Sequence, residues 1–354
     1  MKNNFSNISI CSAFFVAMLA LALNGCKKDS DGSPDVKPGD PVATALSPDS
    51  AGVNTLLTLQ GTGLGDMRSI VFDKNNANAT FYSTLNTGSA IIFRVPDTAV
   101  RGQQNIVLTN SAGKTLTVPF KVLPFGVVSS AFPTDFEPGS LVTLTGNNLD
   151  VVTKVVLSGT TDQATIVSQS LMQMVIKMPA SSVAKATLVL TSSAGDKGTT
   201  IEFVNVAKAT LPLFTNDYVN PAQNWGWGGT YNPSSDYIVS GSASLKAAYD
   251  PNGSWGGLQI GMGTETPIPS ETKYFTFWAK GADADQVITL DIQGNKSTTP
   301  IEVKKNFTVP ANKWTYFKYD IGTLMPGINA LNIIVFQING AGKTIYYDNI
   351  MFTK

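Results

Sequence analysis

The chain has 354 residues, enough for two or three domains, and 43 % of them are hydrophobic. Its 25 basic and 25 acidic side chains give a formal net charge of zero, so no basic surplus favours nucleic acid as a partner. The sequence contains no histidine, which excludes Ser-His-Asp and Cys-His nucleophiles and every histidine-containing metal site. The composition therefore favours binding over catalysis, and no cofactor and no metal are predicted.

Residues 1–25 are predicted to be a signal peptide, because the apolar stretch 8–23 is short for a membrane span. The stretch ends in Leu-Asn-Gly-Cys at 23–26, which resembles a bacterial lipobox. In that motif the cysteine is acylated and becomes the mature N-terminus, so Cys26 is the predicted lipidation site and Cys11 leaves with the peptide. The alternative is an ordinary signal peptide followed by a chance cysteine.

Residues 26–41 are predicted to be a lipid-anchored flexible tether, because they are rich in charge, glycine and proline. Asp29 and Asp31 resemble the acidic surface-export signals of Bacteroidetes lipoproteins, although Lys27 and Lys28 precede them. We therefore expect an outer-membrane protein, lipid-anchored and facing the cell exterior.

Two successive segments, 42–123 and 124–208, repeat each other. In both, short alternating strands are separated by Gly, Pro and Asn, a pattern typical of an immunoglobulin-like sandwich. The matching pieces are Leu-Leu-Thr-Leu-Gln-Gly at 56–61 with Leu-Val-Thr-Leu-Thr-Gly at 141–146, Phe-Arg-Val-Pro at 93–96 with Ile-Lys-Met-Pro at 176–179, and Leu-Thr-Asn-Ser-Ala-Gly at 108–113 with Leu-Thr-Ser-Ser-Ala-Gly at 190–195.

These motifs resemble the IPT/TIG family, with Leu64 and Leu149 standing where that family often has phenylalanine. The resemblance implies two immunoglobulin-like modules in tandem that act as spacers; the alternative is a ligand site within them. A proline at each junction, near Pro124 and within 206–213, is expected to limit bending and to make a semi-rigid stalk.

The segment 209–354 differs in composition, since all five tryptophans lie between 225 and 314. Its alternation again predicts β-strands, and with the two repeats it gives an all-β chain that ends in a larger jelly-roll-like sandwich. The predicted strands are 244–249, 257–260, 274–279, 287–292, 314–319, 333–338 and 345–351.

The stretch Asn224–Tyr231 places Trp225 and Trp227 among glycines, where indoles lack the bulky neighbours of a core strand. We expect an exposed loop, and large exposed apolar surface marks binding sites. Indoles stack on the apolar faces of sugar rings while amides and carboxylates bind the hydroxyls, so Asn224, Trp225, Trp227 and Tyr231 are candidate glycan-binding residues. The alternative is a loop folded back with its rings buried.

The strand after Trp255 places Leu258 and Ile260 on the core face and Trp255 and Gln259 on the other. The same parity turns further polar side chains away from the core and predicts an open sugar-binding face. The candidates added in this way are Trp255, Gln259, Asp291, Gln293 and Gln337.

Three further features allow more than one interpretation. Trp278 fits a binding platform and core packing equally, whereas Trp314, which opens a strand, is expected to be structural. Asp217 and Asp348 lie near the ends of this segment and suit a structural Ca²⁺, but we favour a strand-capping role for Asp348.

Four stretches of the C-terminal segment (244–246, 255–259, 277–281 and 345–350) resemble carbohydrate-binding modules of the β-sandwich type. With the lipobox and tandem IPT modules, the order of modules resembles Bacteroidetes surface glycan-binding proteins of the xyloglucan-binding kind. That resemblance implies non-catalytic capture of a plant-type glycan, xyloglucan or another β-glucan, for a TonB-dependent transporter and its lipoprotein partner.

Two alternatives stay open. A structural surface adhesin shares the tether and spacers but has no reason to expose three tryptophans. A glycan-degrading enzyme needs two carboxylates in a cleft, and Glu265, Glu271 and Glu302 form no recognisable pair in the sequence.

Overall fold

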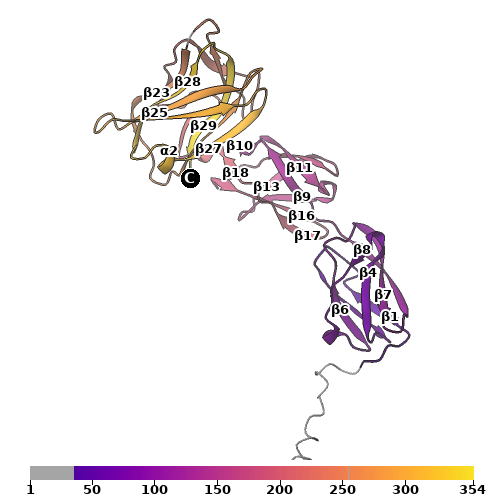
Figure 1. The fold of residues 1–354 in the computed structure, drawn as a ribbon. Helices are drawn as coiled ribbons and strands as arrows, with labels where there is room; N and C mark the ends of the chain where they lie inside the picture. The colour runs from indigo at the N-terminus through magenta and orange to yellow at the C-terminus, as the bar shows by residue number, and fades with distance from the viewer. Residues whose placement is uncertain (1–35, 254) are drawn as a thin grey trace, which may run out of the picture. The chain divides into compact units, whose positions relative to one another are not determined.

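The computed structural model describes residues 36–253 and 255–354. These residues form an all-β protein, in agreement with the predicted fold class (Figure 1). The predicted signal peptide, the lipidation site Cys26 and most of the tether lie outside the described residues. The chain separates into two compact units, the first ending at Pro124 and the second spanning Phe125–Lys354.

Short helices interrupt the strands in a few places. The described part of the chain has no helix that is long and apolar enough to cross a bilayer. The 3₁₀ turns are η1 Asp73–Asn75, η2 Ser83–Leu85, η3 Leu149–Val151 and η4 Val206–Lys208, and the α-helix is α2 Ile321–Leu324.

The first unit is a sandwich of a three-stranded sheet, ordered β1-β3-β6, and a five-stranded sheet, ordered β2-β8-β7-β4-β5. Alternation builds its core: in β3, Leu57 and Leu59 are fully buried while Leu56 faces solvent. Leu64 is also fully buried. The strands are β1 Val42–Ser47, β2 Ser50–Ala51, β3 Leu56–Thr62, β4 Met67–Phe72, β5 Ala77–Asn78, β6 Ala90–Arg94, β7 Gly102–Asn110 and β8 Thr115–Val122.

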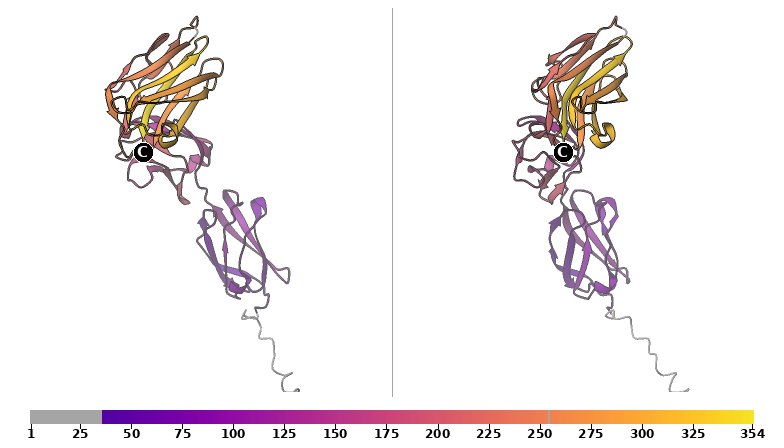
Figure 2. Two further views of the ribbon diagram at one scale, coloured as in Figure 1. Left: turned by 60° about the vertical axis from the view of Figure 1, so that its left-hand side comes forward. Right: turned by 90° about the vertical axis from the view of Figure 1, so that its left-hand side faces the viewer.

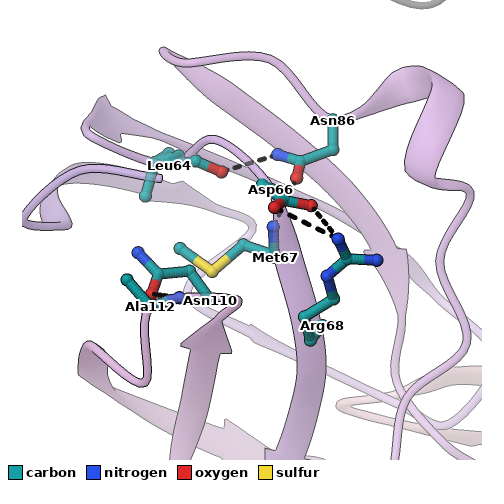
Figure 3. A network of polar contacts seen from close by, with 7 residues as sticks. All are labelled: Leu64, Asp66, Met67, Arg68, Asn86, Asn110 and Ala112. Atoms are coloured by element: carbon teal, nitrogen blue, oxygen red, sulfur yellow. Dashed lines mark hydrogen bonds and ion pairs between the residues drawn. The ribbon is translucent and has the colours of Figure 1, made fainter. Parts of the chain in front are cut away.

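A buried polar network holds the turns at one end of this sandwich (Figure 3). The Asn86 side chain is buried, donates to the Leu64 carbonyl at 2.7 Å and accepts from the Met67 amide at 2.8 Å. Asn110 accepts from the Ala112 amide at 3.1 Å, which shapes the hairpin turn of the repeated Leu-Thr-Asn-Ser-Ala-Gly motif. In the second repeat Ser192 accepts from the Ala194 amide at 3.2 Å. The motif is therefore a turn signal rather than a ligand signal.

The second repeat has the same kind of core, but one sheet runs through seven strands, β17-β16-β12-β13-β14-β11-β9, beside a small β10-β18-β15 sheet. Leu149 is fully buried, as is its counterpart in the first repeat. The strands are β9 Val127–Phe132, β10 Asp135–Phe136, β11 Leu141–Asn147, β12 Lys154–Leu157, β13 Gln163–Gln169, β14 Gln173–Lys177, β15 Lys185–Ala186, β16 Leu188–Ser192, β17 Gly195–Gly198 and β18 Phe203–Asn205.

The last glycine of the matching six-residue motifs, Gly61 and Gly146, is required in both repeats by a close approach of the backbone. A side chain at Gly61 would overlap the Val42 carbonyl, and one at Gly146 would overlap the Val127 carbonyl. In each repeat this close approach lies beside a bulge in the pairing of the first strand with the motif strand.

The C-terminal part of the second unit is a sandwich of two larger sheets, whose strands form two layers (Figures 1 and 2). One layer, ordered β21-β22-β29-β24-β27 with β19 beside β29, is called sheet A here, and the other, ordered β20-β23-β28-β25-β26, is called sheet B. The strands are β19 Leu211–Phe214, β20 Ala222–Asn224, β21 Gly229–Ser234, β22 Ser244–Tyr249, β23 Trp255–Pro267, β24 Tyr274–Lys280, β25 Gln286–Gly294, β26 Ile301–Val309, β27 Trp314–Asp320, β28 Ala330–Asn339 and β29 Thr344–Thr353.

Between the two sheets lies one aromatic and aliphatic core. Phe277 lies near its centre, stacked on Phe317 at 5.0 Å and edge-on to Phe336 at 5.0 Å. The strand parity predicted from the sequence is confirmed here, because the core faces of β23, β25 and β28 are buried. Those core-facing residues are Leu258, Ile260, Ile288, Leu290, Ile292, Ile334, Phe336 and Ile338.

Candidate functional site

The outer face of sheet B, turned away from the core, gathers most of the predicted site residues. Strand register places Gln259, Val335 and Asp291 side by side across β23, β28 and β25. Gln337 and Gln293 lie on the same face, each two residues along its strand from this row and in opposite directions: Gln337 pairs with Thr289, and Gln293 pairs with Ile333. The predicted polar residues therefore share one face of sheet B, although Val335 and Asp291 in its central row are themselves buried.

Two of the tryptophans lie over glycines of β23. The Trp227 backbone pairs with Gly257 through two hydrogen bonds of 3.0 Å, and a side chain at Gly257 would overlap the Trp227 ring. Likewise, the Trp225 amide donates to the Gln259 carbonyl at 2.8 Å, and a side chain at Gly261 would overlap the Trp225 ring. The two glycines therefore provide the space in which the indoles lie against the sheet.

Trp255 completes an aromatic surface, which we call the tryptophan strip (Trp225, Trp227 and Trp255). The Trp255 side chain is 57 % exposed and its ring lies edge-on to Trp227, with centroids 6.2 Å apart. Trp225 is 44 % exposed, and its Nε1 donates to Gln223 Oε1 at 3.2 Å. Exposure of this much indole surface on one face confirms the expectation of exposed rings at Trp225 and Trp255, while Trp227 is half-buried.

The loop that carries the indoles is supported from below by two residues predicted to contact ligand. Tyr231 is only 2 % exposed, lies in the core and donates its hydroxyl to the Trp227 carbonyl at 2.8 Å. Asn224 donates to the Tyr231 carbonyl at 2.7 Å and accepts from the Gly226 amide at 3.0 Å. The prediction for Tyr231 is wrong, because its ring is buried and packs against Tyr249 in the core. Asn224 is exposed and its amide also bonds within the loop, so its contact with a ligand stays a prediction.

On β25 and β26, across β28 from β23, the predicted residue Asp291 belongs to a charged group. Lys304 Nζ lies 3.4 Å from Asp291 Oδ2 and 2.7 Å from Glu302 Oε1. Burial, together with the neighbouring Glu302 carboxylate, raises the pKa of Asp291. The hydrogen bond from Lys304 holds the pKa of Glu302 below its usual range. The structure thus brings together two carboxylates that no spacing in the sequence paired.

A shallow depression of about 370 Å³ lies at the β25–β26 end of this face. Its lining includes Gln293, Glu302, Asn332 and Ile333, so amide and carboxylate groups surround a small apolar floor. The face as a whole offers flat aromatic surface at one side and hydrogen-bonding groups at the other.

Trp278 belongs to packing and not to this face. It is 5 % exposed and lies in β24 of sheet A, edge-on to Phe132 of the second repeat at 5.5 Å. Two residues were considered for a structural Ca²⁺, although a strand-capping role was favoured for Asp348. Asp348 is fully buried and accepts from the Val239 and Asn349 amides, while Asp217 accepts from the Tyr218 amide. Within residues 36–253 and 255–354, no cluster of three His, Cys, Asp or Glu side chains suits a metal ion.

Some residues of the face escaped sequence reasoning. Gly257 and Gly261 carry no side chain to signal a site, and only the i, i+4 spacing of glycines in an otherwise apolar strand marks them. Lys304 was not predicted, and Glu302 was considered only as an unpaired carboxylate, because β26 alternates charged and apolar residues as edge strands commonly do.

Substituting Gly257 with alanine is expected to displace the Trp227 ring, because the new methyl group needs the space that the indole occupies. If this face binds a ligand, affinity should fall at least about fivefold, on the scale of about 1 kcal/mol for a weakened ring contact. Gly322→Ala in α2 is the matched control, since its added methyl meets only one side-chain oxygen. Equal affinities of the two variants in a titration would show that the Trp227 position is irrelevant to binding.

Comparison with known proteins places these observations among related folds. The sequence profile of the IPT/TIG domain matches residues 127–203, so the chain carries an IPT/TIG domain. No curated protein matches the chain.

Solved structures with a similar arrangement include surface glycan-binding proteins. One is SGBP-B from a complex xyloglucan utilization locus in Bacteroides uniformis, with 16 % identity, a TM-score of 0.44, and coverage of 89 % of this chain and 100 % of that one. Another is PbSGBP-B from Prevotella bryantii, with 14 % identity, a TM-score of 0.47, and coverage of 90 % and 99 %. A family 11 carbohydrate-binding module from Clostridium thermocellum, in complex with a β-1,3-1,4-mixed-linked tetrasaccharide, has 13 % identity, a TM-score of 0.32, and coverage of 40 % and 94 %.

Proposed function

We propose that the C-terminal sandwich binds a polysaccharide on the outer face of sheet B and does not cleave it. The observation that carries this proposal is the tryptophan strip: three indoles on one open face, two of them more than 40 % exposed, next to Gln259 and Gln337. Exposed aromatic surface is costly in water unless a ligand covers it. A sugar ring covers an indole with its C–H face and leaves its hydroxyls at the rim for amides.

The charges of the face support binding over hydrolysis. A glycosidase needs one protonated and one ionised carboxyl, free to reach the scissile bond from two sides. Asp291 and Glu302 are instead held by the same Lys304 ammonium, and Asp291 is only 7 % exposed. The chain also has no histidine for proton transfer. We therefore assign Glu302, whose side chain is half-exposed, to hydrogen bonding with hydroxyls, and Asp291 to holding Lys304 in place.

The finer proposal is a plant-type β-glucan, with xyloglucan favoured, captured at the cell surface for a TonB-dependent transporter and its lipoprotein partner. Its support is the lipobox ending in Cys26, the acidic pair Asp29 and Asp31, and the module order of the sequence. In this proposal the two repeats, 42–123 and 124–208, are spacers between the outer membrane and the C-terminal sandwich.

Affinity electrophoresis of the full chain in gels containing xyloglucan, mixed-linkage β-glucan or an unrelated α-glucan tests the proposal. We expect slower migration in the β-glucan gels and unchanged migration in the α-glucan gel. Migration that no polysaccharide alters would favour the structural adhesin. A reducing-end assay after long incubation separates the enzyme from the binding protein, because new reducing ends would show cleavage.

A further inference from the structure

The second repeat and the C-terminal sandwich share a packed junction within the second unit. The Phe132 ring lies edge-on to Trp278 at 5.5 Å, and Trp278 packs on Tyr316 with centroids 5.0 Å apart. A small apolar cluster of Val204, Val206 and Met351 continues the contact. Two hydrogen bonds cross it at the edge, Asn216 Nδ2 to Glu137 Oε1 at 3.1 Å and Lys318 Nζ to Glu202 Oε1 at 3.0 Å.

A carboxyl group lies inside this junction. Asp135, from β10 of the second repeat, has no exposed surface, and neither of its oxygens has a hydrogen-bond partner within the described chain. The Trp278 indole and Asn349 lie close enough to lower its pKa, although neither meets ordinary hydrogen-bond geometry. The hydroxyl of Tyr316 is buried there and is equally unpartnered among the described residues. An ionised carboxylate in these surroundings lacks the compensation that buried charges need.

The charged groups around Asp135 do not provide that compensation. Lys318, whose charge acts on Asp135, is bound to Glu202 at 3.0 Å, and Glu202 also holds Lys185 at 3.2 Å. Asp348 of β29 also interacts with Asp135, and its carboxylate accepts hydrogen bonds from two backbone amides of the C-terminal sandwich at 2.8 Å. Burial raises the pKa of Tyr316, so its hydroxyl stays neutral. The field at Asp135 therefore favours the protonated acid.

The direction of the titration follows from these contacts. Burial raises the pKa of Asp135 to about 7, while Trp278, Asn349 and Lys318 act against that rise. Burial also raises the pKa of Asp348 to about 8, against its hydrogen bonds to backbone amides. Separating the second repeat from the C-terminal sandwich would change the surroundings of Asp135 more than those of Asp348. Asp348 would keep its hydrogen bonds to two amides of the sandwich.

We propose that this junction is a proton-dependent latch, closed when Asp135 carries a proton and loosened when that carboxyl ionises. A carboxyl whose pKa is raised in the closed state, here from 3.8 to about 7, takes up a proton on closing. The stabilisation is complete below about pH 4 and is lost as the pH rises through about 7. One proton changes the ratio of closed to open junction by at most about tenfold per pH unit.

Hydrogen exchange of the full chain, measured by mass spectrometry between pH 5 and 8, tests this proposal. After correction for intrinsic exchange rates, we expect peptides covering 132–137 and 274–280 to lose protection as the pH rises to 7. Peptides of the first unit, such as 67–72, are the internal reference. Equal protection of the junction peptides at all pH values in the unaltered protein would overturn the proposal, whatever the variants do.

The Asp135→Asn variant tests whether Asp135 causes the pH-dependent protection. Its amide keeps the shape of the protonated acid and does not ionise between pH 5 and 8. We expect its junction peptides to show the same protection at every pH. Asp97→Asn, which changes an exposed carboxylate of the first repeat, is expected to follow the unaltered protein. A pH response that Asp135→Asn retains would place the proton on another group and contradict the latch.

Discussion

Replacing Trp225, Trp227 and Trp255 together with alanine is expected to abolish measurable binding of a β-glucan polymer while the sandwich stays folded. Stacking of one ring on an aromatic side chain is worth roughly 1–3 kcal/mol in nucleic-acid complexes, which sets the scale for each lost indole–sugar contact. Three such losses sum to roughly 3–9 kcal/mol. A micromolar complex has about 8 kcal/mol of binding free energy, so even the middle of that range leaves binding in the millimolar region or weaker. Single variants should each weaken binding about 5- to 100-fold in a calorimetric titration.

The fold should survive because these rings lie outside the main core. None of the three belongs to the buried cluster between the sheets, and Trp255 is 57 % exposed. Tyr237→Ala is the matched control, since Tyr237 is 48 % exposed and packs on Tyr346 of sheet A. A triple variant that still binds polysaccharide as tightly as the Tyr237→Ala control would remove the tryptophan strip from the proposed function.

The second large effect is on stability and lies in the second repeat. Gly146→Ala is expected to lower the free energy of unfolding of the second repeat by about 2–3 kcal/mol. The added methyl group would overlap the Val127 carbonyl, and this backbone group cannot move aside as a flexible side chain could. Gly198→Ala in β17 is the control, since no atom lies within 4 Å of its added methyl. Denaturant unfolding of both variants measures the difference, and similar midpoints would show that the strand bulge relaxes without cost.

Much of the fold was accessible from the sequence because strand alternation is a local signal. The parity of β23, β25 and β28 follows from apolar residues at every second position, and it correctly placed Gln259, Asp291 and Gln337 opposite the core. The repeat motifs were equally readable, since Gly146 and Ser192 serve backbone geometry within their own repeat.

The residues that the sequence misplaced or left undecided depend on contacts between distant segments. Tyr231 follows the glycine-rich loop directly, yet it faces the core because β21 begins at Gly229 and its alternation points that ring inward. Trp278 opposes Phe277 in parity, as the sequence indicated, but the face it points to is covered by Phe132 of another domain. The buried Asp135 could not be recognised for the same reason, since a two-residue strand carries no periodicity.

Hydroxyl-radical footprinting of the full chain with and without xyloglucan would show which face of the C-terminal sandwich the polysaccharide covers. We expect Trp225 and Trp255, 44 % and 57 % exposed in the free protein, to become protected when polysaccharide is added. Tyr82 of the first repeat, 76 % exposed, and Tyr237, which packs on Tyr346 of sheet A, should keep their reactivity. Protection of Tyr82 or Tyr237 with unchanged oxidation of Trp225 and Trp255 would contradict a binding face on sheet B.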